Sequence, residues 1–195
     1  MHSSAPRSRP VLPLASLSIR PLRRDDSALL ERVFASMSPQ SRYQRFHAAK
    51  PRLTSADRRY LTSVDERDHI ALIALAPDGT PLAVARAVRL QEDSAAAELA
   101  VEVIDEWQRR GLGTEMITRL ARRAAANGIE RLIARVLVET GLGRGLRRRG
   151  WRPVERDGAS LVLLADAWAL ARAAATAGPA CGRELEPRAA GVRHS

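Results

Sequence analysis

Two carboxylates and two glycines lie close together in the middle of the 195-residue chain. Glu98 and Glu102 belong to an apolar run that ends at Ile104, and a loop that contains Gly111 and Gly113 follows it. A carboxylate on a strand can remove a proton from a substrate as a general base. A glycine loop that opens a helix can hold a phosphate, because its backbone N–H groups and the helix dipole point at one place. This segment therefore combines a proton acceptor with an anion site.

The loop does not match the commonest nucleotide-binding motifs. It lacks the Gly-Lys-Ser/Thr ending of a Walker loop and the full glycine pattern of a Rossmann fingerprint. Two glycines before a helix are about equally consistent with a plain strand-to-helix turn. The surrounding elements have to distinguish these two interpretations.

The hydrophobic period changes along the chain in a way that predicts both strands and helices. Apolar runs separated by polar turns predict three consecutive strands, an antiparallel meander, before the loop. Apolar residues at helical spacing predict an amphipathic helix after the loop, which ends at Asn127-Gly128. The order of elements is therefore mixed α/β. The predicted strands cover residues 17–22, 69–76, 82–90, 96–104, 132–138, 151–156 and 160–164, and the predicted helices follow residues 26, 38, 54, 113, 141 and 165.

Short polar side chains mark the starts of the first three helices. The second helix also has Pro39 in its first turn and is predicted to continue until Pro51. The predicted capping residues are Asp25, Asp26 and Ser27 for the first helix, Ser38 for the second, and Thr54 with Asp57 for the third.

Length and composition indicate one globular domain with appendages. With 45% hydrophobic and 28% charged residues, the chain resembles an ordinary globular protein. Residues 1–16 are predicted to be a flexible basic leader, residues 17–168 the domain, and residues 169–195 an Ala/Arg/Pro-rich tail. The single cysteine, Cys181, excludes an intramolecular disulfide and a cysteine-based zinc site, so a reducing cytoplasm is the expected compartment. No apolar stretch approaches the ~20 residues of a membrane span, so no membrane partner is expected.

The charge is strongly basic and unevenly distributed. The 32 basic and 22 acidic residues give a formal net charge of +10. Residues 1–24 and Arg144–Arg152 each contribute five arginines and no acidic residue. Such clusters can bind nucleic acid, hold an anionic cofactor or remain a solvated face. Because Lys50 is the only lysine, the excess is also consistent with genome-wide codon composition, and nucleic acid is the less favoured partner.

The loop sequence carries a resemblance to a known family. Gln108-Arg109-Arg110-Gly111-Leu112-Gly113 resembles the Gln/Arg-x-x-Gly-x-Gly/Ala signature of the GNAT superfamily of acyl-CoA-dependent N-acetyltransferases. The resemblance extends over residues 17–164 and implies a mixed, mostly antiparallel twisted sheet flanked by helices. It also implies acetyl-CoA as co-substrate, an amine acceptor and no metal. The residues implied to contact acetyl-CoA are Val101 and Val103 on the strand, Arg109, Arg110, Gly111, Leu112, Gly113 and Thr114 at the pyrophosphate, and Thr140 at the pantetheine; core packing is the alternative for the two valines.

A second resemblance narrows the branch of the family. Residues 38–46 are similar to a segment of the Pat-like bacterial protein lysine acetyltransferases, and residues 97–100 resemble their strand with a catalytic glutamate. The resemblance implies Glu98 as the general base and a protein lysine as a candidate acceptor. The chain leaves no room for the cyclic-nucleotide or acyl-CoA synthetase-like domains of some of these enzymes, so we expect no regulation of that kind.

Acetyl transfer needs a base, because an amine with a pKa of ~10.4 is protonated at neutral pH. Glu98 and Glu102 point to the same face of the strand but lie ~13 Å apart along it, so they cannot serve interchangeably. Glu98 is the expected base, and an exposed strand carboxylate is its alternative. Glu102 is expected to orient the substrate or to be solvated.

The chain departs from the family pattern at the leaving group. Many members place an asparagine after the fifth strand and a tyrosine in the next helix, whereas this chain has Thr140 and no tyrosine after Tyr60. A thiolate is a tolerable leaving group near neutral pH, so the departure weakens the catalytic prediction without cancelling it.

The alternatives are an acyl-CoA-binding module without turnover and a nucleic-acid-binding protein that uses Arg144–Arg152. The sequence leaves a homodimer open.

The aromatic residues are predicted to be structural. Tyr43 and Phe46 have the spacing of packing anchors on a helix, Trp107 is expected to cover the loop, and Trp151 is expected to start a strand in the core. His69 has no partner pattern in the sequence.

Overall fold

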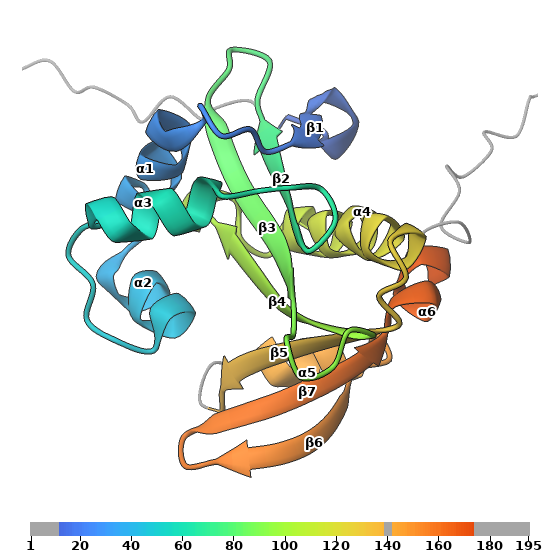
Figure 1. Cartoon of the computed structure of the whole chain (residues 1–195). Helices are drawn as coiled ribbons and strands as arrows, with labels where there is room; N and C mark the ends of the chain where they lie inside the picture. Colours follow the sequence, from blue (N-terminus) through green and yellow to red (C-terminus); the bar gives the residue numbers. More distant parts are fainter. Residues whose placement is uncertain (1–11, 139–141, 174–195) are drawn as a thin grey trace, which may run out of the picture.

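A seven-stranded sheet forms the centre of the protein (Figure 1). The computed structural model describes residues 12–138 and 142–173. The strand order is β1-β2-β3-β4-β5-β7-β6, and every neighbouring pair is antiparallel except β4 and β5. The predicted mixed, mostly antiparallel sheet is confirmed. The strands are β1 (Ser18–Pro21), β2 (His69–Leu75), β3 (Pro81–Arg89), β4 (Ala96–Val103), β5 (Arg131–Leu137), β6 (Arg152–Asp157) and β7 (Ser160–Asp166).

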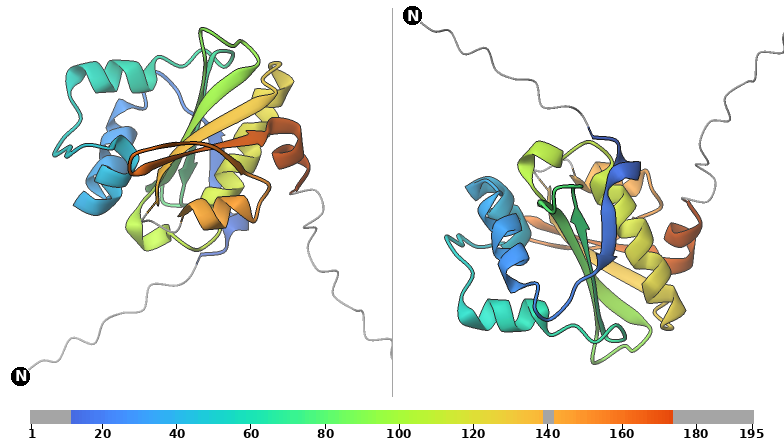
Figure 2. Two further views of the ribbon diagram at one scale, coloured as in Figure 1. Left: turned by 90° about the horizontal axis from the view of Figure 1, so that it is seen from below. Right: turned by 90° about the horizontal axis from the view of Figure 1, so that it is seen from above.

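Helices cover both faces of this sheet (Figure 2). Helices α1, α2 and α3 lie on one face, and α4 lies on the other, with α6 beside it. The helices are α1 (Ser27–Ala35), α2 (Pro39–Phe46), α3 (Ser55–Thr62), α4 (Leu112–Ala126), α5 (Leu142–Arg147) and α6 (Ala167–Ala173), and the 3₁₀ turns are η1 (Leu14–Ser16) and η2 (Asp105–Trp107).

The chain ends lie mostly outside the described residues. Leu12 and Leu14 pack against the core just before β1, and α6 ends at Ala173. The remainder of the predicted leader and most of the predicted tail fall outside the described part, so the domain boundaries stay a prediction. Among the described residues, no helix has the length and apolar character of a membrane span.

Local capping explains two of the helix starts. The Ser38 side chain accepts a hydrogen bond from Ser41 N, and Pro39 begins α2. Thr54 and Asp57 form a reciprocal capping box at the start of α3. Both arrangements satisfy backbone N–H groups that have no partner within the helix, and both predictions are confirmed.

Two other helix predictions are corrected, each for a physical reason. Asp26 is the N-cap residue of α1 as predicted, but its carboxylate makes no capping hydrogen bond, because it accepts hydrogen bonds from the Arg20 guanidinium on β1 at 2.6 and 2.8 Å. Helix α2 ends at Phe46 rather than at Pro51, because His47 takes a left-handed conformation with φ of 52°. A left-handed residue at this position ends a helix by turning its last carbonyls toward new donors.

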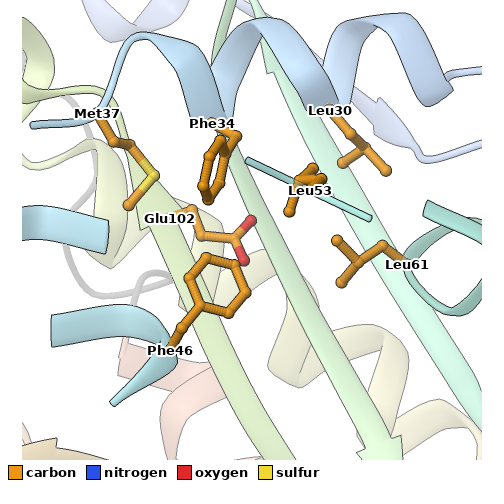
Figure 3. Close-up of a pocket in the computed structure, with 7 residues that line it drawn as sticks. All are labelled: Leu30, Phe34, Met37, Phe46, Leu53, Leu61 and Glu102. Atoms are coloured by element: carbon orange, nitrogen blue, oxygen red, sulfur yellow. The ribbon is translucent and has the colours of Figure 1, made fainter. Parts of the chain in front are cut away.

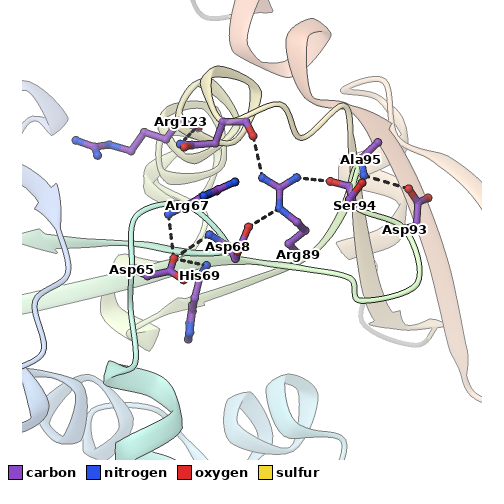
Figure 4. A network of polar contacts seen from close by, with 10 residues as sticks. Asp65, Arg67, Asp68, His69, Arg89, Asp93, Ser94, Ala95 and Arg123 are labelled. Carbon is purple, nitrogen blue, oxygen red and sulfur yellow. Dashed lines mark hydrogen bonds and ion pairs between the residues drawn. The ribbon is translucent and has the colours of Figure 1, made fainter.

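A polar network holds together one end of the sheet (Figure 4). The Asp65 carboxylate accepts hydrogen bonds from three following backbone N–H groups, including that of His69 at 2.8 Å at the start of β2. Arg89, at the end of β3, donates to Asp68 at 2.6 Å and to the Asn127 carbonyl after α4 at 2.8 Å. These contacts fix the end of the sheet that lies away from the loop after β4.

Strand β4 presents different side chains to the two helix layers. Glu102 lines a small cavity together with residues of α1, α2 and α3, and Glu98 points to the same face because side chains alternate along a strand. Val101 and Val103 point to the other face, where Val103 adjoins α4. The carboxylates and the loop helix α4 therefore lie on opposite faces of the same strand.

Strands β4 and β5 diverge soon after they begin. They pair over only three positions, from Ala96 with Arg131 to Glu98 with Ile133, although both strands continue further. Figure 1 shows the two strands separating toward their carboxyl ends. Beyond Glu98, β4 has no strand partner on this side among the described residues. The Val103 carbonyl accepts a hydrogen bond from the Gln108 side chain at 3.1 Å, and the backbone around Val101 is open to a ligand.

Candidate functional site

The loop after β4 makes a left-handed turn into α4. We call residues 105–111 the glycine loop, which begins with η2 and ends at Gly111, the N-cap residue of α4. Arg109 has a φ of 59° and Gly111 a φ of 87°, a region that glycine adopts at little cost. The first hydrogen bond of α4 runs from Glu115 N to the Gly111 carbonyl at 3.1 Å. The N–H groups of the helical residues before Glu115 therefore have no carbonyl partner within the helix.

These N–H groups make the start of α4 suitable for an anion. They belong to Leu112, Gly113 and Thr114, at the positive end of the helix dipole. Thr114 is exposed, so an anion can reach this turn from solvent. The donors fit a pyrophosphate, and among the described residues no group of three or more His, Cys, Asp or Glu side chains suggests a metal.

Gly113 adjoins the strand rather than the open side of the turn. A Cβ at this position would lie 3.6 Å from Val103 Cγ2 on β4. The missing side chain of Gly113 therefore faces the packing surface between α4 and β4. The positive φ of Gly111 remains the strict requirement for glycine in this loop.

Glu98 lies where β4 and β5 separate. It is paired in register with Val88 of β3 and Ile133 of β5, and its side chain is exposed. None of the described residues forms a hydrogen bond or an ion pair with it. A carboxylate in this place is free to accept a proton from a group that enters between the two strands.

Glu102 has a different environment, although it lies on the same face of β4. It is 7% exposed, and its Oε1 accepts a hydrogen bond from Arg45 Nε of α2 at 2.7 Å. The cavity beside it has about 10 Å³, enough for one water molecule at most. The expectation of a solvated Glu102 is therefore wrong. The other residues that line the cavity are Leu30, Phe34, Met37, Phe46, Leu53 and Leu61 (Figure 3).

A second guanidinium, that of Arg86 on β3, is buried on this face. Arg86 is 2% exposed; its Nη1 donates to the Leu61 carbonyl at 3.0 Å and lies 3.2 Å from His69 Nε2. Its Nε and Nη2 have no hydrogen-bond partner among the described residues. Burial lowers the pKa of Arg86, and the charge of Glu102 opposes this shift. Burial, together with the Arg86 charge, also lowers the pKa of His69.

Glu102 is therefore a counter-charge for two guanidinium groups. The sequence prediction missed both Arg45 and Arg86, as well as the partner of His69. Arg86 carried a signal, since it interrupts an otherwise apolar run on β3. Arg45 carried none, because its partner is 57 positions away in the chain.

We expect Glu102→Gln to destabilise the fold by about 3 kcal/mol, because it leaves buried guanidinium charge without compensation. Glu98→Gln is the matched control: the same substitution on the same strand, at an exposed side chain, is expected to change stability by less than about 0.5 kcal/mol. Urea unfolding followed by circular dichroism measures both. Equal stabilities for the two variants would show that Glu102 does not neutralise the buried cations.

The aromatic residues divide into buried and exposed members. Phe46 packs against Phe34 with ring centroids 5.7 Å apart, so its prediction as a packing anchor is confirmed. Tyr43 is 50% exposed, and its prediction as an anchor is wrong, because it points away from the core on the short helix α2. Trp107 is 7% exposed and lies under the Arg110 guanidinium, 5.5 Å from the ring centroid.

Two predictions concern the segment after β5. Thr140 lies outside the described residues. The arginines from Arg144 to Arg152 lie on α5, in the turn after it and at the start of β6; all are exposed, and none of them forms an ion pair with a described residue. Trp151, between these arginines, is 2% exposed, which confirms its predicted place in the core.

The chain is similar to bacterial acetyltransferases in sequence. Acetyltransferase Pat of Mycolicibacterium smegmatis is 35% identical over 106 residues, which cover 52% of this chain and 31% of that protein. The match thus spans about a third of the relative's length.

Solved structures agree with the fold. The GNAT domain of S. lividans PAT superposes with a TM-score of 0.71 and 27% identity, over 76% of this chain and 89% of that chain. A cAMP-binding acyltransferase from Mycobacterium smegmatis superposes with a TM-score of 0.54 and 26% identity, over 88% of this chain and 46% of that chain.

The family itself follows from a match that includes the site. The sequence model of the acetyltransferase (GNAT) family matches residues 30–142, more than half of the chain. This range contains the whole of β4 and β5, the glycine loop and α4. The chain therefore belongs to the acetyltransferase (GNAT) family.

Proposed function

We propose that this protein transfers an acetyl group from acetyl-CoA to a primary amine. The observation that carries the proposal is the turn from β4 into α4, where unpaired N–H groups at a helix start adjoin a strand that has separated from its neighbour. A pyrophosphate suits the first feature, and a linear amide chain suits the second. The resemblance of residues 38–46 and 97–100 to Pat-like protein lysine acetyltransferases makes a protein lysine the proposed acceptor class.

Each part of the site has a proposed role in binding. The backbone from Arg109 to Thr114 would hold the pyrophosphate, and the open edge of β4 at Val101 and Val103 would pair with the pantetheine arm. Thr140, outside the described residues, is the proposed further contact of this arm. Bound acetyl-CoA supplies the activated acetyl thioester.

Glu98 is the proposed general base. An amine must lose a proton before it attacks, and Glu98 is exposed beside the separation of β4 and β5 with no partner among the described residues. Glu102 is less suited to this role, because Arg45 already donates a hydrogen bond to it and apolar side chains enclose it. The side chain of Glu98 would take the proton directly or through one water molecule.

No described side chain is assigned to protonate the leaving thiolate. Helix α5 contains no tyrosine, and the chain has none after Tyr60. Water can supply this proton, since a thiolate leaves without a strong acid near neutral pH. The missing tyrosine also favours a second candidate function, an acyl-CoA-binding module that holds its ligand without turnover.

A thiol-release screen separates these two functions. Acetyl-CoA is offered with simple amines, amino acids, aminoglycosides and lysine-containing peptides and proteins, and free thiol is measured. An acetyltransferase releases thiol in step with one acceptor class. Saturable binding of acetyl-CoA without thiol release from any acceptor would support the binding module instead.

We expect the C-terminal segment to be dispensable for the reaction. Residues after Gly178 lack an apolar period, and the site residues named above all precede them. A chain shortened at Gly178 should keep its circular dichroism spectrum, its melting temperature and its turnover within about twofold, the range of ordinary surface changes. Loss of turnover in a folded shortened chain would place part of the active site, or of a required interface, in the tail.

A further inference from the structure

A carboxylate at the start of the glycine loop is bonded to a different helix. Asp105 Oδ1 accepts a hydrogen bond from Ser41 Oγ of α2 at 2.7 Å, and Asp105 Oδ2 accepts one from Ser38 N at 3.0 Å. Helix α2 and η2 lie side by side in both views of Figure 2. Burial acts to raise the pKa of Asp105, but the hydrogen bonds from the two serines outweigh burial, so the pKa is lowered. The Asp105 carboxylate is therefore ionised at neutral pH.

Gln108 ties the same contact to the loop. Its Nε2 donates to Ser41 Oγ at 3.1 Å, to Asp105 Oδ1 at 3.0 Å and to the Val103 carbonyl at 3.1 Å. The next residue, Arg109, has the left-handed φ of 59°. The Gln108 side chain therefore fixes the chain immediately before the turn that directs the N–H groups of α4.

Helix α2 is held to β4 at a second point. Arg45 follows Ser41 by four residues, so both side chains lie on one face of α2. Arg45 bonds to Glu102 on β4, while Ser41 bonds to Asp105 just beyond β4. Two carboxylates thus anchor the start and the end of a helix that packs against both β4 and β5, beside the place where these strands separate.

We propose that Asp105 and Gln108 are positioning residues that couple the glycine loop to α2, so that acetyl-CoA and the acceptor strengthen each other's binding. The inference rests on the proposed function, which supplies the two ligands. A pyrophosphate that orders the loop also orders Gln108 and Asp105, and through them the helix beside the acceptor. Coupling between two ligands is reciprocal, so it can be measured either as the effect of the acceptor on acetyl-CoA affinity or as the effect of acetyl-CoA on acceptor affinity.

Ser41→Ala tests the proposal, because Ser41 lies on α2 and reaches the loop only through Asp105 and Gln108. Calorimetric titration should show acetyl-CoA binding to the full-length variant about three- to tenfold more weakly, which is less than the full effect of a hydrogen bond to a charged group because the loss reaches the ligand through the loop. The acceptor KM should rise by a similar factor, with a smaller change in kcat. Ser55→Ala is the control: its Oγ bonds to Arg58 on α3 and touches neither the loop nor α2, so its acetyl-CoA affinity should equal that of the wild type.

Hydrogen exchange separates coupling from a merely structural role. Acetyl-CoA should slow the exchange of α2 backbone amides in the wild type and should have less effect in Asp105→Asn. The amide nitrogen of asparagine cannot accept a hydrogen bond, so this variant loses one of the two bonds from the serines. Ser41→Ala should lower the affinity less in the Asp105→Asn background than in the wild type, because the two changes share the connection between Ser41 and Asp105.

The outcomes distinguish this inference from the function on which it rests. Wild-type affinity in Ser41→Ala, or α2 exchange that ignores acetyl-CoA in the wild type, overturns the coupling while the acetyltransferase proposal stands. A wild-type protein that binds no acetyl-CoA overturns both.

Discussion

Glu98→Gln is expected to lower the turnover of a saturating amine by about 10²–10⁴, the usual effect of losing a general base. Glutamine keeps the volume and the hydrogen-bonding reach of the side chain but cannot take up the proton. Because Glu98 is exposed and separate from the glycine loop, acetyl-CoA affinity should stay close to that of the wild type. Steady-state kinetics together with calorimetric titration of acetyl-CoA measure both parts of this result.

The pH dependence makes the same test sharper. Wild-type turnover should depend less on pH than that of Glu98→Gln, because the carboxylate removes the proton that the amine otherwise loses only at high pH. The defect of Glu98→Gln should shrink at high pH, because more of the amine arrives already neutral. Glu102→Gln should have a smaller effect, chiefly on the acceptor KM, since Glu102 holds α2 through Arg45. Normal turnover in Glu98→Gln together with a large loss in folded Glu102→Gln would move the base four residues along β4.

Thr114→Glu is expected to weaken acetyl-CoA binding by about ten- to a hundredfold, because a carboxylate at the start of α4 repels the pyrophosphate. Thr114 is exposed and is the third residue of α4. A glutamate at this position of a helix is favourable, since it interacts with the positive end of the helix dipole. The variant should therefore fold as well as the wild type, and the loss of affinity cannot be attributed to unfolding.

Thr114→Gln is the neutral control for this variant. It has nearly the same size as glutamate and lacks the charge, so its acetyl-CoA affinity should remain within about threefold of the wild type, as for an ordinary surface change. The difference between the two variants should decrease as salt is added, because the repulsion is partly screened. Equal affinities for glutamate and glutamine would place the pyrophosphate away from the start of α4.

The sequence predicts most of the elements that carry this site. The strand from Ala96, the turn at Gly111 and the amphipathic α4 all follow from hydrophobic period and glycine position, which are local properties. The capping residues Ser38 and Thr54 were predictable for the same reason, since a cap acts within three residues.

The errors arise where a distant partner decides the role of a side chain. Asp26 looks like a helix cap but is bonded to Arg20 on a neighbouring strand. The alternation of side chains along β4 places both of its carboxylates on one face, yet only Glu102 is enclosed by residues of α1, α2 and α3. The period of side chains along a strand indicates the face of the sheet on which each one lies. It cannot indicate which part of that face the helices cover.

In the proposed reaction, the acetyl group passes from acetyl-CoA to an amine at this site. Acetyl-CoA labelled with carbon-13 in its acetyl group tests it directly, with the amine that passes the thiol-release screen as acceptor and mass spectrometry as the readout. We predict that the label appears as an amide on the acceptor in equal amount to the free thiol, and that both are lost in Glu98→Gln and in Thr114→Glu at acetyl-CoA concentrations below saturation. Acetyl-CoA that binds the protein and stays intact with every acceptor class, or thiol released without labelled amide, would exclude acetyl transfer to an amine at this site.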